Sequence, residues 1–169
     1  MTRSRMWLHA SIGAALLACS ALAQAGEMSL KDLPKSVQQT VLARFKGAKV
    51  VSAAGEKNQE QQLIYEVNLR DKGRNIDVTL QPTGELILIE KQISFSELPK
   101  PTAETLNQRY PKARYKLVEE IYKVDQGKET LAYYEALLTD TGKQVWAMEL
   151  AADGTVLKVE KRKSLEEED

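Results

Sequence analysis

Apolar and polar residues alternate along most of the chain beyond residue 47, with the two-residue period of half-buried strands. The predicted strands are 48–54, 63–69, 76–80, 85–93, 113–124, 130–139, 144–150 and 155–161. Short turns link successive strands, and such short links favour antiparallel hairpins. We therefore expect an antiparallel sheet.

Two shorter segments follow the 3.6-residue period of a helix. Val37, Val41 and Phe45 recur at i, i+4 and i+8, and the stretch 102–110 repeats this spacing. A Leu-Pro-Lys triplet precedes each segment, and proline suits a first helical turn because its missing N–H has no partner to lose there. We expect each helix to bury this apolar stripe on the sheet.

The chain also repeats itself. Leu30–Val50 aligns with Phe95–Tyr115, and the hairpins that follow align in the same order. The predicted fold class is therefore α+β, with two tandem repeats that each pack one N-terminal helix on three to four antiparallel strands. Residues 26–94 are assigned to the first repeat, 95–162 to the second, and 163–169 to a charged C-terminal tail.

The residues of the two repeats carry a family resemblance. Each repeat opens with a Leu-Pro helix that ends on an aromatic residue, and the first continues in hairpins as YEV-L…G…I-V-L…G-L. This pattern resembles PepSY-like domains, and the pairing from Leu30 to about Lys161 is similar to the beta-lactamase-inhibitor-like, PepSY-like proteins of the bacterial periplasm. The resemblance implies a binding or inhibitor-like module that holds its partner on the exposed face of its sheet, and it brings no catalytic residues. The two-repeat inhibitor of this family uses disulfides. This chain would have none after cleavage of residues 1–25, because no cysteine would remain.

Residues 1–25 have the three-part pattern of an export signal. A basic start and an apolar run precede Ala-Gln-Ala at 23–25, which predicts cleavage before Gly26 and release into the periplasm. The alternative is a lipoprotein anchored at Cys19. The apolar run is shorter than the roughly 20 residues that span a bilayer, so we expect no transmembrane segment.

Cleavage before Gly26 would remove the only histidine, His9, and the only cysteine, Cys19. It would also lower Lys plus Arg from 24 to 22 against 24 Asp plus Glu, a net charge of 22 − 24 = −2. A near-neutral chain gives no electrostatic reason to expect nucleic acid. Without His or Cys the familiar nucleophilic triads are excluded, and a zinc site would have to consist of carboxylates alone, which is unusual. We predict a protein that is not an enzyme, with no catalytic residues, cofactor or metal.

Four carboxylates are candidates for acid–base chemistry or calcium binding. Glu66 and Glu135 occupy equivalent strand positions and invite a paired acid–base role. Their strand parity instead predicts that both face solvent. Asp71 and Asp140 lie near turn glycines without alternating acidic neighbours, so we expect turn residues rather than calcium ligands.

An apolar, aromatic-tipped patch on the outward side of the sheet is the best binding candidate. The predicted partner-binding residues are Leu131, Tyr133, Leu137, Ile64, Leu86 and Leu88. The alternative is that curvature of the sheet, a bulge or the C-terminal tail covers these residues. The predicted partner is an unidentified periplasmic protein or peptide. The alternative is a small ligand or a metal ion such as calcium, and the sequence leaves the oligomeric state open.

The orientation of Trp146 depends on which turn sets the register. Counting forward from Gly142 places it outward, whereas counting back from Gly154 aligns it with the core positions of 76–80. The second count also keeps Glu149 out of the core, where an unpaired carboxylate would be costly. We therefore predict that Trp146 is a core residue beneath the second helix.

Overall fold

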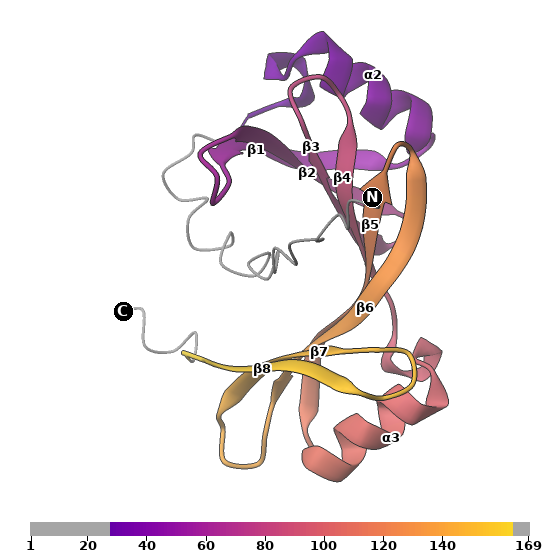
Figure 1. The fold of residues 1–169 in the computed structure, drawn as a ribbon, viewed down its shortest axis with the longest axis vertical. Coiled ribbons are helices and arrows are strands. Elements are labelled where there is room, and N and C mark those ends of the chain that lie inside the picture. The colour runs from indigo at the N-terminus through magenta and orange to yellow at the C-terminus, as the bar shows by residue number, and fades with distance from the viewer. Residues whose placement is uncertain (1–27, 164–169) are drawn as a thin grey trace, which may run out of the picture.

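The computed structural model describes residues 28–163 and joins eight strands in one antiparallel sheet, in sequence order (Figure 1). The strands are β1 (Lys49–Lys57), β2 (Leu63–Asp71), β3 (Arg74–Leu80), β4 (Leu86–Gln92), β5 (Arg114–Asp125), β6 (Lys128–Thr139), β7 (Val145–Leu150) and β8 (Val156–Arg162). The helices are α2 (Lys35–Arg44) and α3 (Lys100–Arg109), and the one-turn helices η2 (Leu30–Asp32) and η3 (Phe95–Glu97) precede them. Every strand lies within three residues of its predicted bounds.

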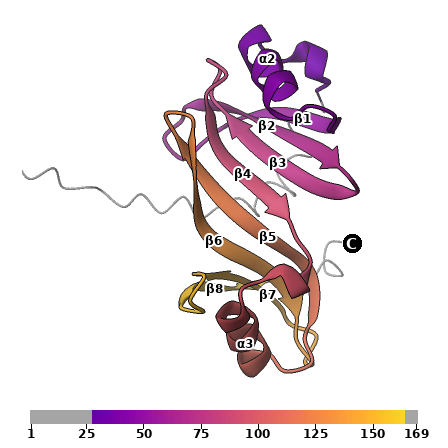
Figure 2. The same cartoon turned by 90° about the vertical axis from the view of Figure 1, so that its right-hand side faces the viewer.

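The predicted fold class, two tandem helix-plus-strand repeats, is wrong. β4 pairs with β5 from Leu88↔Lys123 to Gln92↔Glu119, so the ladder continues without a break, and only two short helices accompany it. Figure 2 shows these two strands side by side in the middle of the sheet. The physical reason is that a unit ending at β4 would leave an edge of unpaired N–H and C=O groups, which β5 pairs. The predicted division between residues 94 and 95 stays a prediction.

Both helices cover the same face of the sheet and lie outside its curve (Figure 1). Val37 and Val41 of α2 bury against β2 and β3, and Leu106 of α3 buries against β6 and β7. This is the packing that the apolar stripes predict. The opposite face, on the inside of the curve, has neither helix on it.

Two glycine turns fix the helices against the sheet. Gly84, between β3 and β4, has φ +85°, and a Cβ there would lie 2.6 Å from the carbonyl oxygen of Ser36 in α2. Thr40 Oγ1 donates a 2.8 Å hydrogen bond to the Gly84 carbonyl. Gly154, between β7 and β8, approaches Pro101 of α3 in the same way, with 2.7 Å from the built Cβ to its carbonyl oxygen. Only glycine fits such a close approach at positive φ.

Trp146 lies on the helix-covered face, as predicted, but it is half-buried rather than a fully buried core residue. It packs at the border of the cluster beneath α3, with its ring centroid 5.5 Å from that of Tyr110. Its Nε1 donates a 2.8 Å hydrogen bond to Asp140 Oδ2. Asp140 lies in the turn between β6 and β7 and also accepts a hydrogen bond from the backbone N–H of Gln144, which confirms its predicted turn role.

Several predictions fall outside the described residues. They are the signal peptide at 1–25, the lipoprotein alternative at Cys19, and all but the first residue of the tail at 163–169. Within residues 28–163, no helix has both the length and the apolar character needed to cross a bilayer.

Candidate functional site

Carboxylates from seven consecutive strands line the face opposite the helices, which we call the open face. They are Glu56 (β1), Glu66 (β2), Asp77 (β3), Glu90 (β4), Glu119 (β5), Glu135 (β6) and Glu149 (β7), and we call them the acidic row. Side chains alternate between the two faces along each strand, so the apolar residues between them face the helices.

Strand register brings these carboxylates together. Asp77 lies directly opposite Glu90, and Glu135 lies directly opposite both Glu119 and Glu149. Glu90 and Glu119 are diagonal neighbours, because Gln92 is the residue paired with Glu119. Directly opposite Cβ atoms lie about 5 Å apart and diagonal ones about 7–8 Å, so the row is a continuous line of carboxyl groups.

The environment of the row opposes ionisation. Burial, followed by the neighbouring carboxylates, raises the pKa of Glu90 to about 9 and of Glu119 to about 8. Burial also raises the pKa of Glu135 to about 7 and of Asp77 to about 6. It raises the pKa of Glu66 as well, with a further contribution from Glu56. At neutral pH the row therefore retains protons that ordinary carboxyls have released.

Glu119 and Glu135 are the most enclosed members, with 5% and 7% of their surface exposed. The causes of the raised pKa of Glu119 are burial and other carboxylates, whereas Arg162 and Lys158 partly offset the effect of burial on Glu135. The prediction that Glu135 faces solvent is wrong, and Glu66 is only partly exposed. Their strand parity was read correctly, but the concave curvature draws neighbouring side chains together over this face.

The open face also carries an apolar cluster in its middle strands. Leu88, Ile121 and Tyr133 are buried and pack together with Ala132. Leu88 and Tyr133 belong to the predicted partner-binding set, whereas Ile121 was not predicted as a binding residue. Ile64, on the same strand face as Glu66, is also buried, and Leu137 is half-buried opposite Ala147.

The structure corrects two predicted binding residues, Leu86 and Leu131. Leu86 packs in the core beneath α2 and Leu131 against the core beneath α3, so both face the helices. The register shifts by one residue at Ile87 and at Ala132, and each shift reverses the strand parity on which the prediction depended.

Basic residues neutralise one end of the row. Lys158 of β8 lies 3.8 Å from Glu149 and 2.6 Å from Glu160, and Arg162 lies 2.7 Å from Glu160. These two cations also lower the pKa of Glu135, against the larger effect of burial. The part of the row from β2 to β5 contains no such ion pair among the described residues.

The row has the wrong shape for a metal cage. Among residues 28–163, no group of three or more His, Cys, Asp or Glu residues is arranged to hold a metal ion. The carboxylates follow a line across the sheet, whereas calcium needs six to eight oxygens around one point. Asp71, the other considered calcium ligand, lies at the end of β2 and lines a pocket elsewhere.

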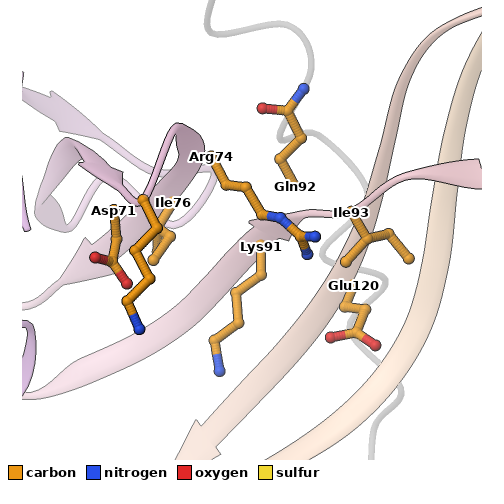
Figure 3. A pocket seen from close by; sticks show the side chains of 8 residues that line it. Asp71, Arg74, Ile76, Lys91, Gln92, Ile93 and Glu120 are labelled. Carbon is orange, nitrogen blue, oxygen red and sulfur yellow. The ribbon is translucent and has the colours of Figure 1, made fainter. Parts of the chain in front are cut away.

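That pocket, of about 420 Å³, lies beside the β2–β3 turn (Figure 3). Its lining residues are Asp71, Lys72, Arg74, Ile76, Lys91, Gln92, Ile93 and Glu120. Two of its cations already have partners. Arg74 pairs with Glu97 at 2.9 Å, and Lys91 lies 3.4 Å from Glu129 and 4.3 Å from the centroid of the Tyr122 ring. The pocket is therefore a weaker candidate than the open face.

Solved bacterial proteins share this architecture. A protein from Bacteroides eggerthii, named as periplasmic, superposes with a TM-score of 0.62 at 13% identity, covering 76% of this chain and 88% of its own. A DUF2874 family protein from Bacteroides ovatus gives 0.58 at 14% identity, covering 76% and 87%. A BLIP-like protein from Bacteroides fragilis gives 0.58 at 11% identity, covering 78% and 88%.

The fold of this chain is similar to the folds of these three proteins. At such low identities the likeness concerns the fold alone, and residue roles do not transfer. No family model matches the sequence, and no curated protein matches it.

Proposed function

We propose that this protein is an exported, non-enzymatic, PepSY-like binding module that holds a protein or peptide segment on its open face. One observation carries the proposal. Glu119 and Glu135 are buried carboxyls with raised pKa values on a face that no described helix covers, next to the apolar cluster of Leu88, Ile121 and Tyr133. Strongly shifted pKa values of this kind are concentrated at functional sites.

The shared fold supports the kind of function. One similar structure is named BLIP-like and another periplasmic, which agrees with a binding role and with the export pattern of residues 1–25. A periplasmic location is part of the proposal. An inhibitory role toward a peptidase or another periplasmic enzyme is the more specific form of the proposal.

An enzymatic role has less support. Carboxyls with raised pKa values are suited to acid–base catalysis, and the acidic row contains several. A catalytic site also needs a cavity where substrate and reacting groups converge. The row instead lies along a sheet, and the pocket of about 420 Å³ is lined by other residues.

Site-specific photocrosslinking tests the proposal. We would place a crosslinking amino acid at Lys123, exposed on the open face beside Leu88, and separately at Leu42, exposed on α2. In the periplasm of a Gram-negative host, we expect a discrete crosslinked partner at Lys123 that excess unlabelled protein displaces. A Tyr133→Ala, Leu137→Ala double variant with an intact melting transition should weaken it.

Crosslinks of equal yield at both positions, or at Leu42 alone, would contradict binding on the open face. A rise in melting temperature with calcium or a lipid, without any protein crosslink, would instead favour the alternative of a small-ligand or metal-ion protein.

A further inference from the structure

The acidic row lacks matching positive charge over most of its length. The raised pKa values of Glu90 and Glu119 have only burial and other carboxylates as causes. Cations lower the pKa of Glu135 and Glu149 at the β6–β7 end, where Lys158 and Arg162 act on both carboxyls and Lys123 of β5 acts on Glu149. Like charges opposite one another destabilise a sheet. The middle of the row therefore has an electrostatic cost that a cationic ligand would relieve.

The shape of the row favours an extended cation over a single ion. Adjacent strands lie about 4.8 Å apart, so the stretch from Glu66 on β2 to Glu135 on β6 spans about 19 Å. A segment of about six residues in extended conformation covers the same length, at about 3.3 Å per residue. The metal-ion alternative requires converging ligands, which the described residues do not provide.

The apolar cluster adds a second match. Leu88, Ile121 and Tyr133 lie on β4, β5 and β6, beside Glu90, Glu119 and Glu135 on the same strands and the same face. Lysine and arginine side chains bury their aliphatic stems on apolar surface while their charged ends reach polar partners. An apolar strip next to a line of carboxylates fits such side chains.

We propose that the partner segment held on the open face is basic, and that its lysine or arginine side chains pair with the carboxylates of the acidic row from Glu66 to Glu135. This inference rests on the proposed function and specifies the chemistry of the partner. Arginine and lysine form charge-assisted hydrogen bonds with carboxylates, which are stronger than neutral ones.

Pairing of this kind depends on pH. The charged and titratable groups facing the row include Glu56, Glu66, Arg70, Asp77, Glu90, Glu119, Lys123, Tyr133, Glu135, Glu149, Lys158, Glu160 and Arg162. The carboxyls of the row lose protons as pH rises through 6 to 9, while lysine and arginine of the ligand stay charged. Binding should therefore strengthen from pH 6 to pH 8.5 and release protons.

The test measures binding of a fluorescent six-lysine peptide to the purified protein by anisotropy. A six-glutamate peptide and a neutral Gly-Ser peptide of the same length serve as ligand controls. We expect saturable binding of the lysine peptide, about tenfold stronger at pH 8.5 than at pH 6 at constant ionic strength. Binding to either control peptide at similar strength would overturn the inference.

Two double variants separate the row from general surface charge. Glu119→Gln with Glu135→Gln should weaken binding of the lysine peptide by about tenfold or more. Glu85→Gln with Glu104→Gln removes the same two charges from exposed positions outside the row and should change binding by less than about twofold. Equal losses in the two variants would mean nonspecific attraction and would overturn the inference.

The crosslinking assay distinguishes failure of the inference of a basic partner from failure of the proposed function. If the Tyr133→Ala, Leu137→Ala variant loses the crosslink and the Glu119→Gln, Glu135→Gln variant keeps it, the partner binds the open face without pairing to the acidic row. This result would support the proposed function and overturn the inference that the partner is basic. Retention in both variants would overturn the proposed function itself. Displacement of the lysine peptide by an equimolar amount of calcium would show a point-cation site, and this too would overturn the inference.

Discussion

Replacing Glu119 with glutamine removes a charge from the middle of the acidic row and keeps the shape of the side chain. Burial raises the pKa of Glu119 to about 8, from an ordinary value of 4.5. Between these pH values the folded protein holds a proton that the unfolded chain has released. The stability associated with this proton is present below pH 4.5 and is lost as pH rises through about 8. Glu119→Gln should therefore stabilise the protein at high pH and have little effect near pH 5.

The magnitude follows from the two pKa values of Glu119. A tenfold change in proton affinity corresponds to about 1.4 kcal/mol, so the gap between 4.5 and about 8 limits the loss of unfolding free energy to about 5 kcal/mol at pH above 8. Glu90 and Glu135 share the same environment and can hold protons in its place. We therefore expect a gain of about 2 kcal/mol for the variant at pH 8.5, a large part of the 5–15 kcal/mol that is typical of domains.

Urea unfolding followed by tryptophan fluorescence measures this difference. At pH 8.5 the midpoint of Glu119→Gln should lie about 1 M urea above that of the parent, because m-values for domains of this size are about 1–3 kcal/mol per molar urea. At pH 5 the midpoints should nearly coincide. Glu85→Gln, in the exposed β3–β4 turn, is the control and should show no such pH dependence. Equal stabilisation at both pH values, or destabilisation at pH 8.5, would refute the electrostatic reasoning.

The remaining predictions concern stability and can be measured by urea unfolding, followed by far-UV circular dichroism because Trp146→Phe removes the fluorescent reporter. The parent protein itself should have a lower unfolding free energy at pH 8.5 than at pH 5.5, because the carboxyls of the row have raised pKa values; a rise with pH would contradict this. Gly84→Ala should cost more than about 2 kcal/mol, whereas Gly73→Ala, at the same φ of +85° but with no atom within 4 Å of the new Cβ, should cost about 1 kcal/mol. Equal costs would mean that the approach to α2 has no energetic importance. Trp146→Phe should lose about 1 kcal/mol with its hydrogen bond to Asp140, and Met148→Ala, which is fully buried, about 2–5 kcal/mol. A smaller loss for Met148→Ala than for Trp146→Phe would contradict the placement of Met148 in the core.

Sequence patterns located the elements because each pattern reports a local property. Alternation revealed which residues of a strand share a face, so all eight strands were found within three residues of their bounds. The orientation of Trp146 was also predictable, since only one register kept Glu149 out of the core. In both cases the information lies within one strand or one hairpin.

The continuity of the sheet was not predictable in this way. Pairing of β4 with β5 depends on backbone hydrogen bonds across a connection that contains α3, and these bonds leave no side-chain signature. The one-residue register shifts at Ile87 and Ala132 were equally hidden, which is why Leu86 and Leu131 were assigned to the wrong face. A shift of one residue reverses a face while the composition of the strand stays the same.

The acidic row was missed for a related reason. Glu66 and Glu135 were noticed as equivalent positions, but each was judged on its own strand, where a carboxylate on the outward parity normally meets solvent. Their environment is set by Asp77, Glu90 and Glu119 on neighbouring strands, and those neighbours are known only once the full strand order is known. The sequence does contain a signal: each of seven successive strands has a carboxylate at a position whose side chain points away from the helices.

The single sheet also determines where binding should occur. Two separate repeats would divide the acidic row between Glu90 and Glu119, whereas pairing of β4 with β5 makes these two carboxylates neighbours. Their pKa values, about 9 and about 8, exceed those of Glu66, Asp77 and Glu135, and Leu88 and Ile121 of the apolar cluster lie on the same two strands. Both electrostatic cost and apolar surface are thus concentrated at the β4–β5 junction. Since that junction exists only in the joined sheet, a partner that binds there would depend on both halves of the chain, and neither half alone would present the site.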